Sequence, residues 1–600
     1  MDLSATAPGS QSSQVEHRGW IEPEIECIPL SGRLAFGVVT TSRPTDTSIN
    51  QLVEVVEPLP QASIPGPHEN PTLLVILLTP GLARYALDSS LTDALYQRFK
   101  IDAKPGVTIE TTSAIVDRLP AGSNEPEGSE GMAYMLFRDP STTKSEDRTA
   151  FQQSAQKPGS LTFRMPRWVP HGGAPLMDYE LQLPLSQTIF TTGSVSTLIH
   201  RTFAVETPSG SLSLSHEQKL ESETLQLPAM PKKFDSQGFT VPLVPLTPFR
   251  RINYVMGNII RKLSSQPAKV LKRVGNGKID QAKSSGVAEN DMPASQELEK
   301  SVSRYFEALD LQPETVSVWA LVIPQNTNPP LLSGSLRGLC VRPLLKADDE
   351  FITSAWHPAS KHATDAAKGI SNALRILIPR GARLIKVLSG GGGWGKKAGL
   401  LSLDPDVQYS TRELRQDEGW TFDFDDVGDG TGAATEAQKN QALGQIVKEG
   451  ESIMFLLAPK PEHLPQERGQ ASKSKYKKLP RTLEWTFGAI PSSIDMVPQN
   501  VTSDTNVATI HHYPGHFGML SEGGMALTVN QVQGTVGQTK LDVPFGTFAI
   551  HHFDVNYFQL GSVAQHAELS AASSVAPQAS TAQQTHSTAQ AKQTTEPVQT

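Results

Sequence analysis

The chain has 600 residues, 38% of them hydrophobic and 19% charged, and it carries a formal net charge of −8 at pH 7. This composition is typical of a globular protein of roughly two to four domains, and it excludes a collagen-like or wholly disordered chain. The only two cysteines, Cys27 and Cys340, exclude a disulfide framework and a cysteine-based zinc site, so we expect a reducing compartment.

The first twenty residues show neither the basic-then-apolar layout of a secretory signal nor the arginine-rich layout of a mitochondrial one. The dense apolar run at 73–78 is far shorter than the about 20 residues that a membrane-crossing helix needs. We therefore expect an intracellular protein of the cytoplasm or nucleus without a transmembrane segment. The alternative is a mitochondrial protein whose N-terminus is incomplete in this sequence.

Residues 1–19 are polar and aperiodic, and we expect them to be disordered. Residues 20–245 are predicted to form a β-rich domain, because short apolar and β-branched runs alternate with clusters of Pro, Gly, Ser and Thr. Its first predicted strands are RLAFGVVTT (33–41), QLVEVVEPL (51–59) and TLLVILLT (72–79). An apolar stripe predicts a helix over 81–100.

A basic amphipathic helix and linker are predicted over 246–290. Thr247 is suited to cap a helix that begins at Pro248, and apolar residues then recur at steps of three and four. These residues are Phe249, Ile252, Val255, Met256, Ile259, Ile260 and Leu263. Packing within its own domain is the first interpretation of the predicted helix 247–263; docking on a protein partner or on an anionic membrane surface is the alternative.

A mixed α/β domain is predicted over 291–560. Amphipathic patterns predict helices over 293–311 and 360–378, and short apolar runs predict strands over 315–323 and 382–388. The pattern after these elements indicates mainly strands.

The last segment, 561–600, has no aromatic residue and consists largely of Ala, Ser, Thr and Gln, so we expect a disordered low-complexity tail. The expected fold class is therefore mixed α+β. A β-rich N-terminal domain and an α/β C-terminal domain are joined in this prediction by the basic helical linker.

A glycine-rich loop, SGGGGWGKKAG, occupies 389–399. Gly390, Gly395 and Lys396 match the first seven positions of a phosphate-binding loop, but Lys397 stands where a hydroxyl should hold magnesium. The residues that follow predict another strand, whereas a phosphate-binding loop needs a helix at this point. We therefore predict a strand–loop–strand hairpin. The loop either binds phosphate groups by its amides, Trp394 and lysines, or is a simple turn.

Positive charge is segregated into three windows of this acidic chain. Residues 246–286 carry +8, residues 375–397 carry +6 and residues 467–481 carry +5, so the remainder of the chain carries −27. Such segregation is typical of a surface that binds a polyanion on an otherwise repulsive body. The alternative is that the first and third of these windows are solvated linkers.

We predict a non-enzymatic nucleic-acid-associated protein, with RNA as the expected partner. The expected contacts are Arg250, Arg251, Arg380, Arg383, Lys386, Trp394, Lys396, Lys397, Lys475, Tyr476, Lys477 and Lys478. The alternatives are a scaffold that docks through the predicted helix 247–263 and an enzyme that binds a phosphate-bearing ligand at 389–399.

No catalytic residue, metal site or cofactor is predicted. His511 and His512 lie in a predicted strand, where adjacent side chains point to opposite faces, and the same holds for the pair at 551–552. Pro514 and Gly515 argue against a helix that would align His512 with His516. The acidic run at 417–432 fails to supply the ligands of an EF-hand loop, and no nucleophile motif is present.

Replacing Lys396 and Lys397 together by Ala is expected to weaken binding of single-stranded RNA, because each lysine that contacts a phosphate releases counterions. The slope of log affinity against log salt concentration should become shallower by about 1.4. Fluorescence anisotropy at several salt concentrations measures both quantities. An unchanged affinity would remove the loop from the binding surface.

Overall fold

The structure is a computed structural model that describes residues 34–58, 73–99, 108–120, 127–137, 145–150, 158–168, 177–206, 212–227, 236–268, 291–325, 341–390, 399–406, 446–460, 482–492, 508–531 and 534–553. The expected disordered ends, 1–19 and 561–600, lie outside these residues. The described part is a mixed α+β structure dominated by sheets, as the sequence predicts.

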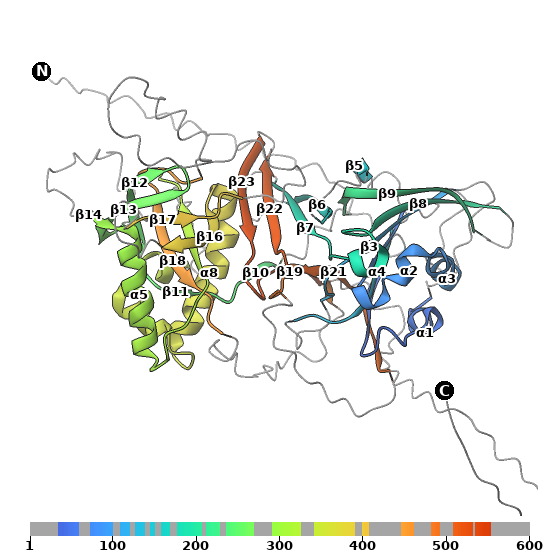
Figure 1. Ribbon diagram of the computed structural model, residues 1–600, viewed down its shortest axis with the longest axis horizontal. Coiled ribbons are helices and arrows are strands. Elements are labelled where there is room, and N and C mark those ends of the chain that lie inside the picture. Colours follow the sequence, from blue (N-terminus) through green and yellow to red (C-terminus); the bar gives the residue numbers. More distant parts are fainter. Residues whose placement is uncertain are drawn as a thin grey trace, which may run out of the picture.

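Twelve strands of the described residues form one large sheet, on the right in Figure 1. Its order is β20 (Ile510–Pro514), β1 (Leu34–Thr41), β4 (Gly131–Phe137), β2 (Leu73–Leu78), β3 (Thr108–Ile115), β8 (Leu198–Val205), β9 (Leu212–Gln226), β6 (Ser160–Trp168), β7 (Met177–Pro184), β22 (Met525–Gln531) and β23 (Gly534–Leu541), and β5 (Ser145–Ala150) pairs with β9. Because β20 pairs with β1 and β22 with β7, segments from the beginning and the end of the chain build this sheet together.

Both faces of β2 are buried, which explains its unbroken apolar run LLVILL. Leu73, Val75 and Leu77 belong to the main hydrophobic core, whereas Leu74 and Ile76 face a second core under the helices. The helices over this second face are α1 (Ile49–Glu54), η2 (Pro80–Leu82), α2 (Arg84–Leu87) and α3 (Ser90–Arg98). A short helix, α4 (Ile189–Thr192), lies beside α2.

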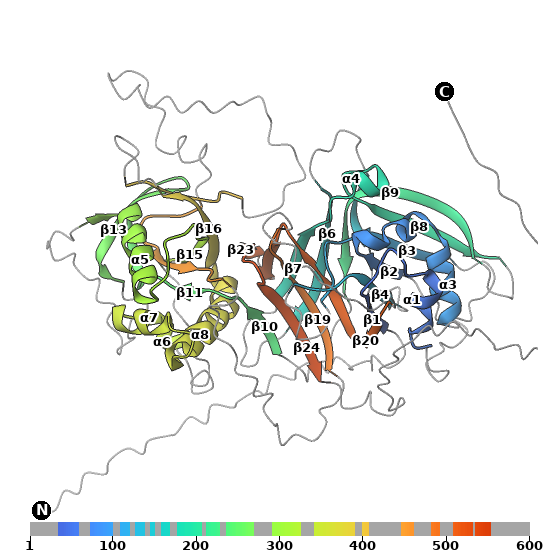
Figure 2. The same cartoon turned by 60° about the horizontal axis from the view of Figure 1, so that its bottom comes forward.

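A four-stranded sheet closes the main core on the other face of the large sheet (Figure 2). Its order is β10 (Ser236–Thr240), β24 (Thr547–Phe553), β19 (Thr482–Ala489) and β21 (His516–Ser521). Phe487 and Phe517 of this sheet pack on Phe163 of β6, with ring centroids 4.7 and 6.1 Å apart respectively. These aromatic contacts hold the two sheets face to face.

A third sheet closes on itself. Its six closing strands are β12 (Arg250–Met256), β13 (Ile259–Pro267), β17 (Leu401–Leu403), β16 (Arg383–Gly390), β15 (Val318–Ile323) and β18 (Ser452–Leu457), and β18 pairs back with β12. Two short strands, β11 (Val244–Pro245) and β14 (Asp291–Pro293), extend it. Ile252, Ile260, Trp319, Leu401 and Phe455 are fully buried and belong to the main core.

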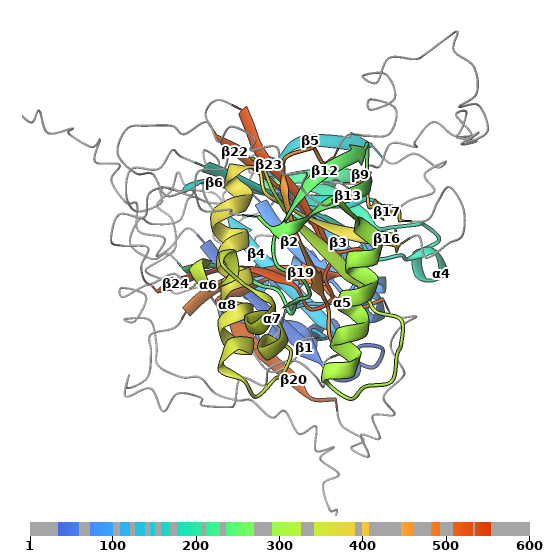
Figure 3. The ribbon, with the colours of Figure 1, turned by 90° about the vertical axis from the view of Figure 1, so that its left-hand side faces the viewer.

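Helices cover one end of this closed sheet, and Figure 3 looks onto them. They are α5 (Ala294–Ala308), α6 (Val341–Leu345), α7 (Asp349–Ala355), α8 (Lys361–Leu377) and the 3-10 turn η4 (Ile378–Arg380). Ser360 caps α8 by accepting a hydrogen bond from the amide of Ala363, and the positive φ of Gly381 ends the turn that follows it.

The closed sheet and the large sheet meet along β16 and β23. The Thr539 hydroxyl accepts a hydrogen bond from the Leu384 amide at 2.8 Å and donates one to the Leu384 carbonyl at 2.9 Å. Gly537 lies so close to the Ile378 carbonyl that a β-carbon there would come within 2.2 Å of its oxygen. Buried apolar residues of both sheets form one continuous core, so the two sheets are packed together rather than linked by a mobile segment.

The strand pairing does not follow the expected boundaries between domains, because strands of 482–553 pair with strands before residue 241. The two predicted helices that became α5 and α8 and the predicted strands β1, β2, β15 and β16 are confirmed. The predicted strand at 51–59 is wrong: the chain forms helix α1 instead. Ser48 and Gln51 form a capping box at its start, a signal stronger than the β-branched residues.

The predicted helix 247–263 is also wrong, since these residues form the β12–β13 hairpin. Met256 pairs with Ile259, which leaves Gly257 and Asn258 as a two-residue turn, and Gly257 has φ +58°. Three shifts of register interrupt the alternation of buried and exposed residues along this pair. These shifts make the apolar spacing resemble that of a helix. The Gly-Asn pair at 257–258 is the sequence signal for the hairpin turn, but the helical spacing outweighed it in the prediction.

Replacing Gly257 by Ala tests the hairpin directly. The left-handed φ of this turn should make the substitution destabilising by about 1–2 kcal/mol, whereas in a helix interior the same change would stabilise by up to about 1 kcal/mol. The measurement is the free energy of unfolding in urea. Gly238→Ala is the matched control, because its added β-carbon meets no atom within 4 Å; its effect should stay near zero.

Candidate nucleic-acid interface

The outer face of the β12–β13 hairpin carries exposed cations, and these belong to the basic window 246–286. Arg251, Arg261 and Lys262 are all exposed, and Tyr254 is 36% exposed between them. The opposite face of the same hairpin is fixed in the core through Ile252, Ile260 and Leu263, each fully buried. A rigid apolar underside therefore positions a basic, aromatic upper side. We call these four exposed residues the hairpin face.

Arg261 and Tyr254 form a cation–π pair on this face. The guanidinium carbon of Arg261 lies 5.6 Å from the centroid of the Tyr254 ring. Such pairing orients the flat guanidinium at little cost in side-chain entropy, because the ring beneath it is held by a strand. A planar, charged surface of this kind is one on which an unpaired base stacks.

Lys262 is held in place at the edge of the hairpin by Asp291 of β14. The Lys262 ammonium lies 3.2 Å from Asp291, whose other carboxylate oxygen accepts a hydrogen bond from Asn253 at 2.8 Å. The hydrogen bonds from Asn253 and then Lys262 lower the pKa of the Asp291 carboxyl. With Asp291 counted, the hairpin face has a net charge of +2, and the exposed Lys262 keeps two of its three N–H donors for other partners.

The two ends of the glycine-rich loop emerge beside this face. Strand β16 ends at Gly390, which pairs with Leu401 of β17, and Leu401 pairs in turn with Ile260 of the hairpin. Gly399, with φ +85°, would bring a β-carbon within 3.2 Å of Pro293, which pairs with Lys262. The first two basic windows of the sequence, 246–286 and 375–397, thus meet on one sheet.

The order of elements around the loop is that of a hairpin. Strand β17 follows the loop and pairs antiparallel with β16, as the sequence predicts. A phosphate-binding loop of the nucleotide-hydrolysing kind needs a helix N-terminus directed at the phosphates. The described residues after this loop supply a strand instead, so an enzyme mechanism built on such a loop has no support from the fold.

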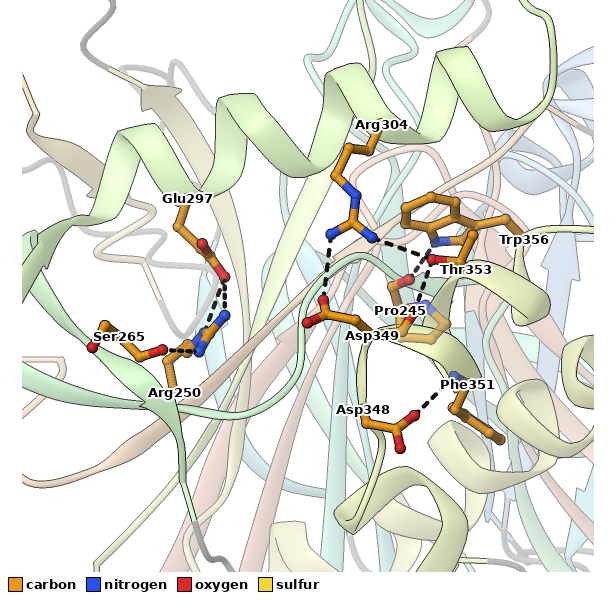
Figure 4. A network of polar contacts seen from close by, with 10 residues as sticks. All are labelled: Pro245, Arg250, Ser265, Glu297, Arg304, Asp348, Asp349, Phe351, Thr353 and Trp356. Carbon is orange, nitrogen blue, oxygen red and sulfur yellow. Dashed lines mark hydrogen bonds and ion pairs between the residues drawn. The ribbon is translucent and has the colours of Figure 1, made fainter.

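Arg250, which the sequence places in the interface, is buried. Its guanidinium donates hydrogen bonds to Glu297 of α5 at 2.9 and 3.0 Å and another to the Ser265 carbonyl (Figure 4). The side chain therefore ties α5 to the hairpin from within. We leave Arg250 out of the interface, because a cation committed to a buried carboxylate is not available to a ligand.

Arg383 also has a structural role, in strand β16 of the closed sheet. It binds Glu451 through both carboxylate oxygens, at 2.6 and 2.7 Å, and donates to the Ile446 carbonyl. Glu451 is buried and also accepts a hydrogen bond from the Lys448 amide. This bidentate pair fixes the segment that leads into β18.

Arg380 and Lys386 are partly buried on other parts of the closed sheet. Arg380 donates to the Ile376 carbonyl, and burial lowers the pKa of its guanidinium. Lys386 lies 5.6 Å from the ring of Trp319, whose indole N–H donates to Asp542 of the large sheet at 2.7 Å. Arg380 belongs to the turn η4, and Lys386 lies at the joint between the sheets.

Of the predicted contacts Arg250, Arg251, Arg380, Arg383 and Lys386, the structure exposes Arg251. Tyr254, Arg261 and Lys262, which are not among the predicted contacts, lie with it on the exposed side of the hairpin. All three belong to the basic window 246–286, which is the sequence signal that points to them. Trp394, Lys396, Lys397, Lys475, Tyr476, Lys477 and Lys478 lie outside the described residues and stay predictions.

The histidines of β20 and β21 contact different partners and do not form a shared site. His512 lies 3.0 Å from the Tyr134 hydroxyl, and His516 lies 3.8 Å from Glu484. Within the part of the chain that the structure describes, no three His, Cys, Asp or Glu side chains gather in a way that could hold a metal ion.

Comparison of the chain with protein-family models, curated proteins and solved structures returned no match. Among the described helices, none combines the length and the apolar character needed to cross a bilayer. The candidate interface therefore stands on its own geometry.

Truncation of two neighbouring arginines should affect the free energy of unfolding to very different extents. Arg250→Ala leaves the buried Glu297 carboxylate without its partner and is expected to lower the free energy of unfolding by about 3 kcal/mol or more. Arg251→Ala removes an exposed side chain and should change it by no more than about 0.5 kcal/mol. Urea unfolding of both variants provides the comparison; equal effects would contradict the assignment of Arg250 to the fold and Arg251 to the surface.

Proposed function

We propose that the protein binds single-stranded RNA along the hairpin face, and that it does so without catalysing a reaction. The observation that carries the proposal is the placement of Arg251, Arg261 and Lys262 around Tyr254 on one rigid hairpin. An RNA strand offers the two chemical groups that this face matches, a phosphate backbone and unpaired bases.

The electrostatic part of the proposal concerns the backbone. The chain as a whole has a net charge of −8, so a polyanion is repelled by most of its surface. The hairpin face supplies three exposed cations against one carboxylate, which concentrates attraction at one place. Contacts of this kind give affinity without sequence preference, and they weaken steeply as salt rises.

The stacking part concerns the bases. The Arg261 guanidinium rests over the Tyr254 ring, so a base that stacks on the guanidinium continues an existing stack. Stacking on a protein side chain contributes about 1–3 kcal/mol per base and tolerates all four bases. It also requires an unpaired strand, because a base inside a duplex has no free face.

The base of the glycine-rich loop extends the surface at the Lys262 edge, since Gly399 lies against Pro293, the partner of Lys262, and Gly390 lies across β17 from the hairpin. Trp394, Lys396 and Lys397 remain predicted contacts of the loop. The scaffold alternative loses its docking element, because the helix over 247–263 is not formed.

The test compares two sets of charge removals. Arg251, Arg261 and Lys262 are replaced by Ala together, and the control replaces Lys300, Lys361 and Lys368, which are exposed on α5 and α8. Because three cations leave the hairpin face, the slope of log affinity against log salt should become shallower by about 2 in the first variant only. Fluorescence anisotropy with labelled single-stranded RNA measures it; single-stranded DNA and duplex RNA are the comparison ligands.

A second variant separates stacking from charge. Arg261→Lys keeps the positive charge but removes the planar guanidinium, so affinity should fall several-fold while the salt slope stays the same. Equal loss of affinity in the hairpin and control triple variants would refute the hairpin face as the binding site. Absence of binding to any of the three nucleic acids at low salt would refute the function itself.

A further inference from the structure

A short protrusion between β7 and β8 carries Phe190, the most exposed large apolar side chain of the described residues. Helix α4 places Phe190 at 102% and Ile189 at 50% relative exposure. Leu87 of α2, the helix that contacts α4, is 45% exposed. Figure 3 shows α4 standing out from the side of the molecule. Single exposed apolar residues are common, but these three lie on two neighbouring helices and form a small apolar patch, which is the feature that indicates a binding surface.

The protrusion is internally bonded. The Thr188 hydroxyl donates to the Ser194 carbonyl at 3.0 Å and lies 2.8 Å from the Thr197 hydroxyl. The hydroxyls of Thr191 and Thr192 donate back to the Thr188 carbonyl at 3.0 and 3.2 Å. Four threonine hydroxyls are thus satisfied within the loop, whereas Gln187, Ile189 and Phe190 are exposed.

The same segment carries no charge. No Asp, Glu, Lys, Arg or His occurs from 185 to 199. The nearest cation along α2, Arg84, is bound to the carbonyls of Thr45 and Thr47 at 2.9 and 3.0 Å. Gly193, with φ +75°, ends α4 where an added β-carbon would meet no atom within 4 Å. Residues 185–199 are therefore uncharged and Gly193 faces open space, whereas the exposed Asp88 lies next to Leu87 at the edge of the protrusion.

These features distinguish a lipid surface from a protein partner. A stable protein–protein interface buries about 800 Å² on each side, whereas a phenylalanine contributes about 200 Å² and its two neighbours are only half exposed. A protein partner also tolerates free hydroxyls, because it can bond to them. Hydrocarbon cannot, and the internally bonded threonine hydroxyls and the absence of charge from 185 to 199 suit it, with Gln187 at the level of the headgroups.

We propose that the α4 protrusion inserts Phe190 and Ile189 into the surface of a phospholipid bilayer, with Leu87 at the edge of the contact. The attachment is reversible, because the apolar area is small. This attachment uses different residues from those of the predicted membrane-binding helix 247–263. It is also independent of RNA binding at the hairpin face.

Flotation of the full chain with phosphatidylcholine vesicles tests the proposal. Phe190→Ala should lower the partition coefficient about tenfold, since the lost side chain is the largest apolar group that inserts. Leu388→Ala is the matched control, because Leu388 is 55% exposed on β16, outside the protrusion; it should change partitioning less than about twofold. Binding should be the same at low and high salt.

A second measurement detects weak insertion. Phe190→Trp is added to vesicles whose acyl chains carry bromine, and its tryptophan fluorescence should be quenched more than that of the unmodified chain. Flotation no greater than without vesicles, together with no additional quenching, would overturn the proposal. So would an equal loss in the Leu388 variant, or binding that appears only with anionic lipid and disappears with salt.

Discussion

The antiparallel pairing of β12 with β13 is the constraint on which the closed sheet depends. Once the chain turns at Gly257 and Asn258, β12 can reach β18 on one side and β13 can reach β17 on the other. These two contacts complete the ring of strands, and they bring the base of the glycine-rich loop to the hairpin. A straight helix over the same residues would have left the ring open and its apolar interior in water.

The basic residues of the closed sheet fall into two populations with different physical roles. Arg250 and Arg383 are buried and matched by Glu297 and Glu451, so each pair holds a helix or a connecting segment to the sheet. Desolvation makes such charges costly unless they are bonded, and both pairs form several hydrogen bonds, although the Nε of Arg383 is buried without a partner among the described residues. The cations of the hairpin face remain in water, where they can neutralise a ligand at small cost.

Sequence reasoning succeeded where one local signal dominated. The helix α8 has a cap, a buried stripe and Pro379 just after its end, and β2 has an unbroken apolar run; both elements were predicted. It failed at β12–β13, because shifted register mimics a helical period, and at α1, because a capping box competes with β-branched residues. Charge alone could not separate buried Arg250 from exposed Arg251, since burial is decided by partners such as Glu297 that lie 47 positions away in the chain.

Strands β22 and β23 have a consequence for the biogenesis of the protein. Residues 525–541 complete the edge of the large sheet and also press Thr539 and Gly537 against β16 and η4. During synthesis, neither apolar interior is sealed until these residues have left the ribosome, although most of the chain has by then emerged. The nascent protein must therefore keep an incomplete core from aggregating until its C-terminal strands are added.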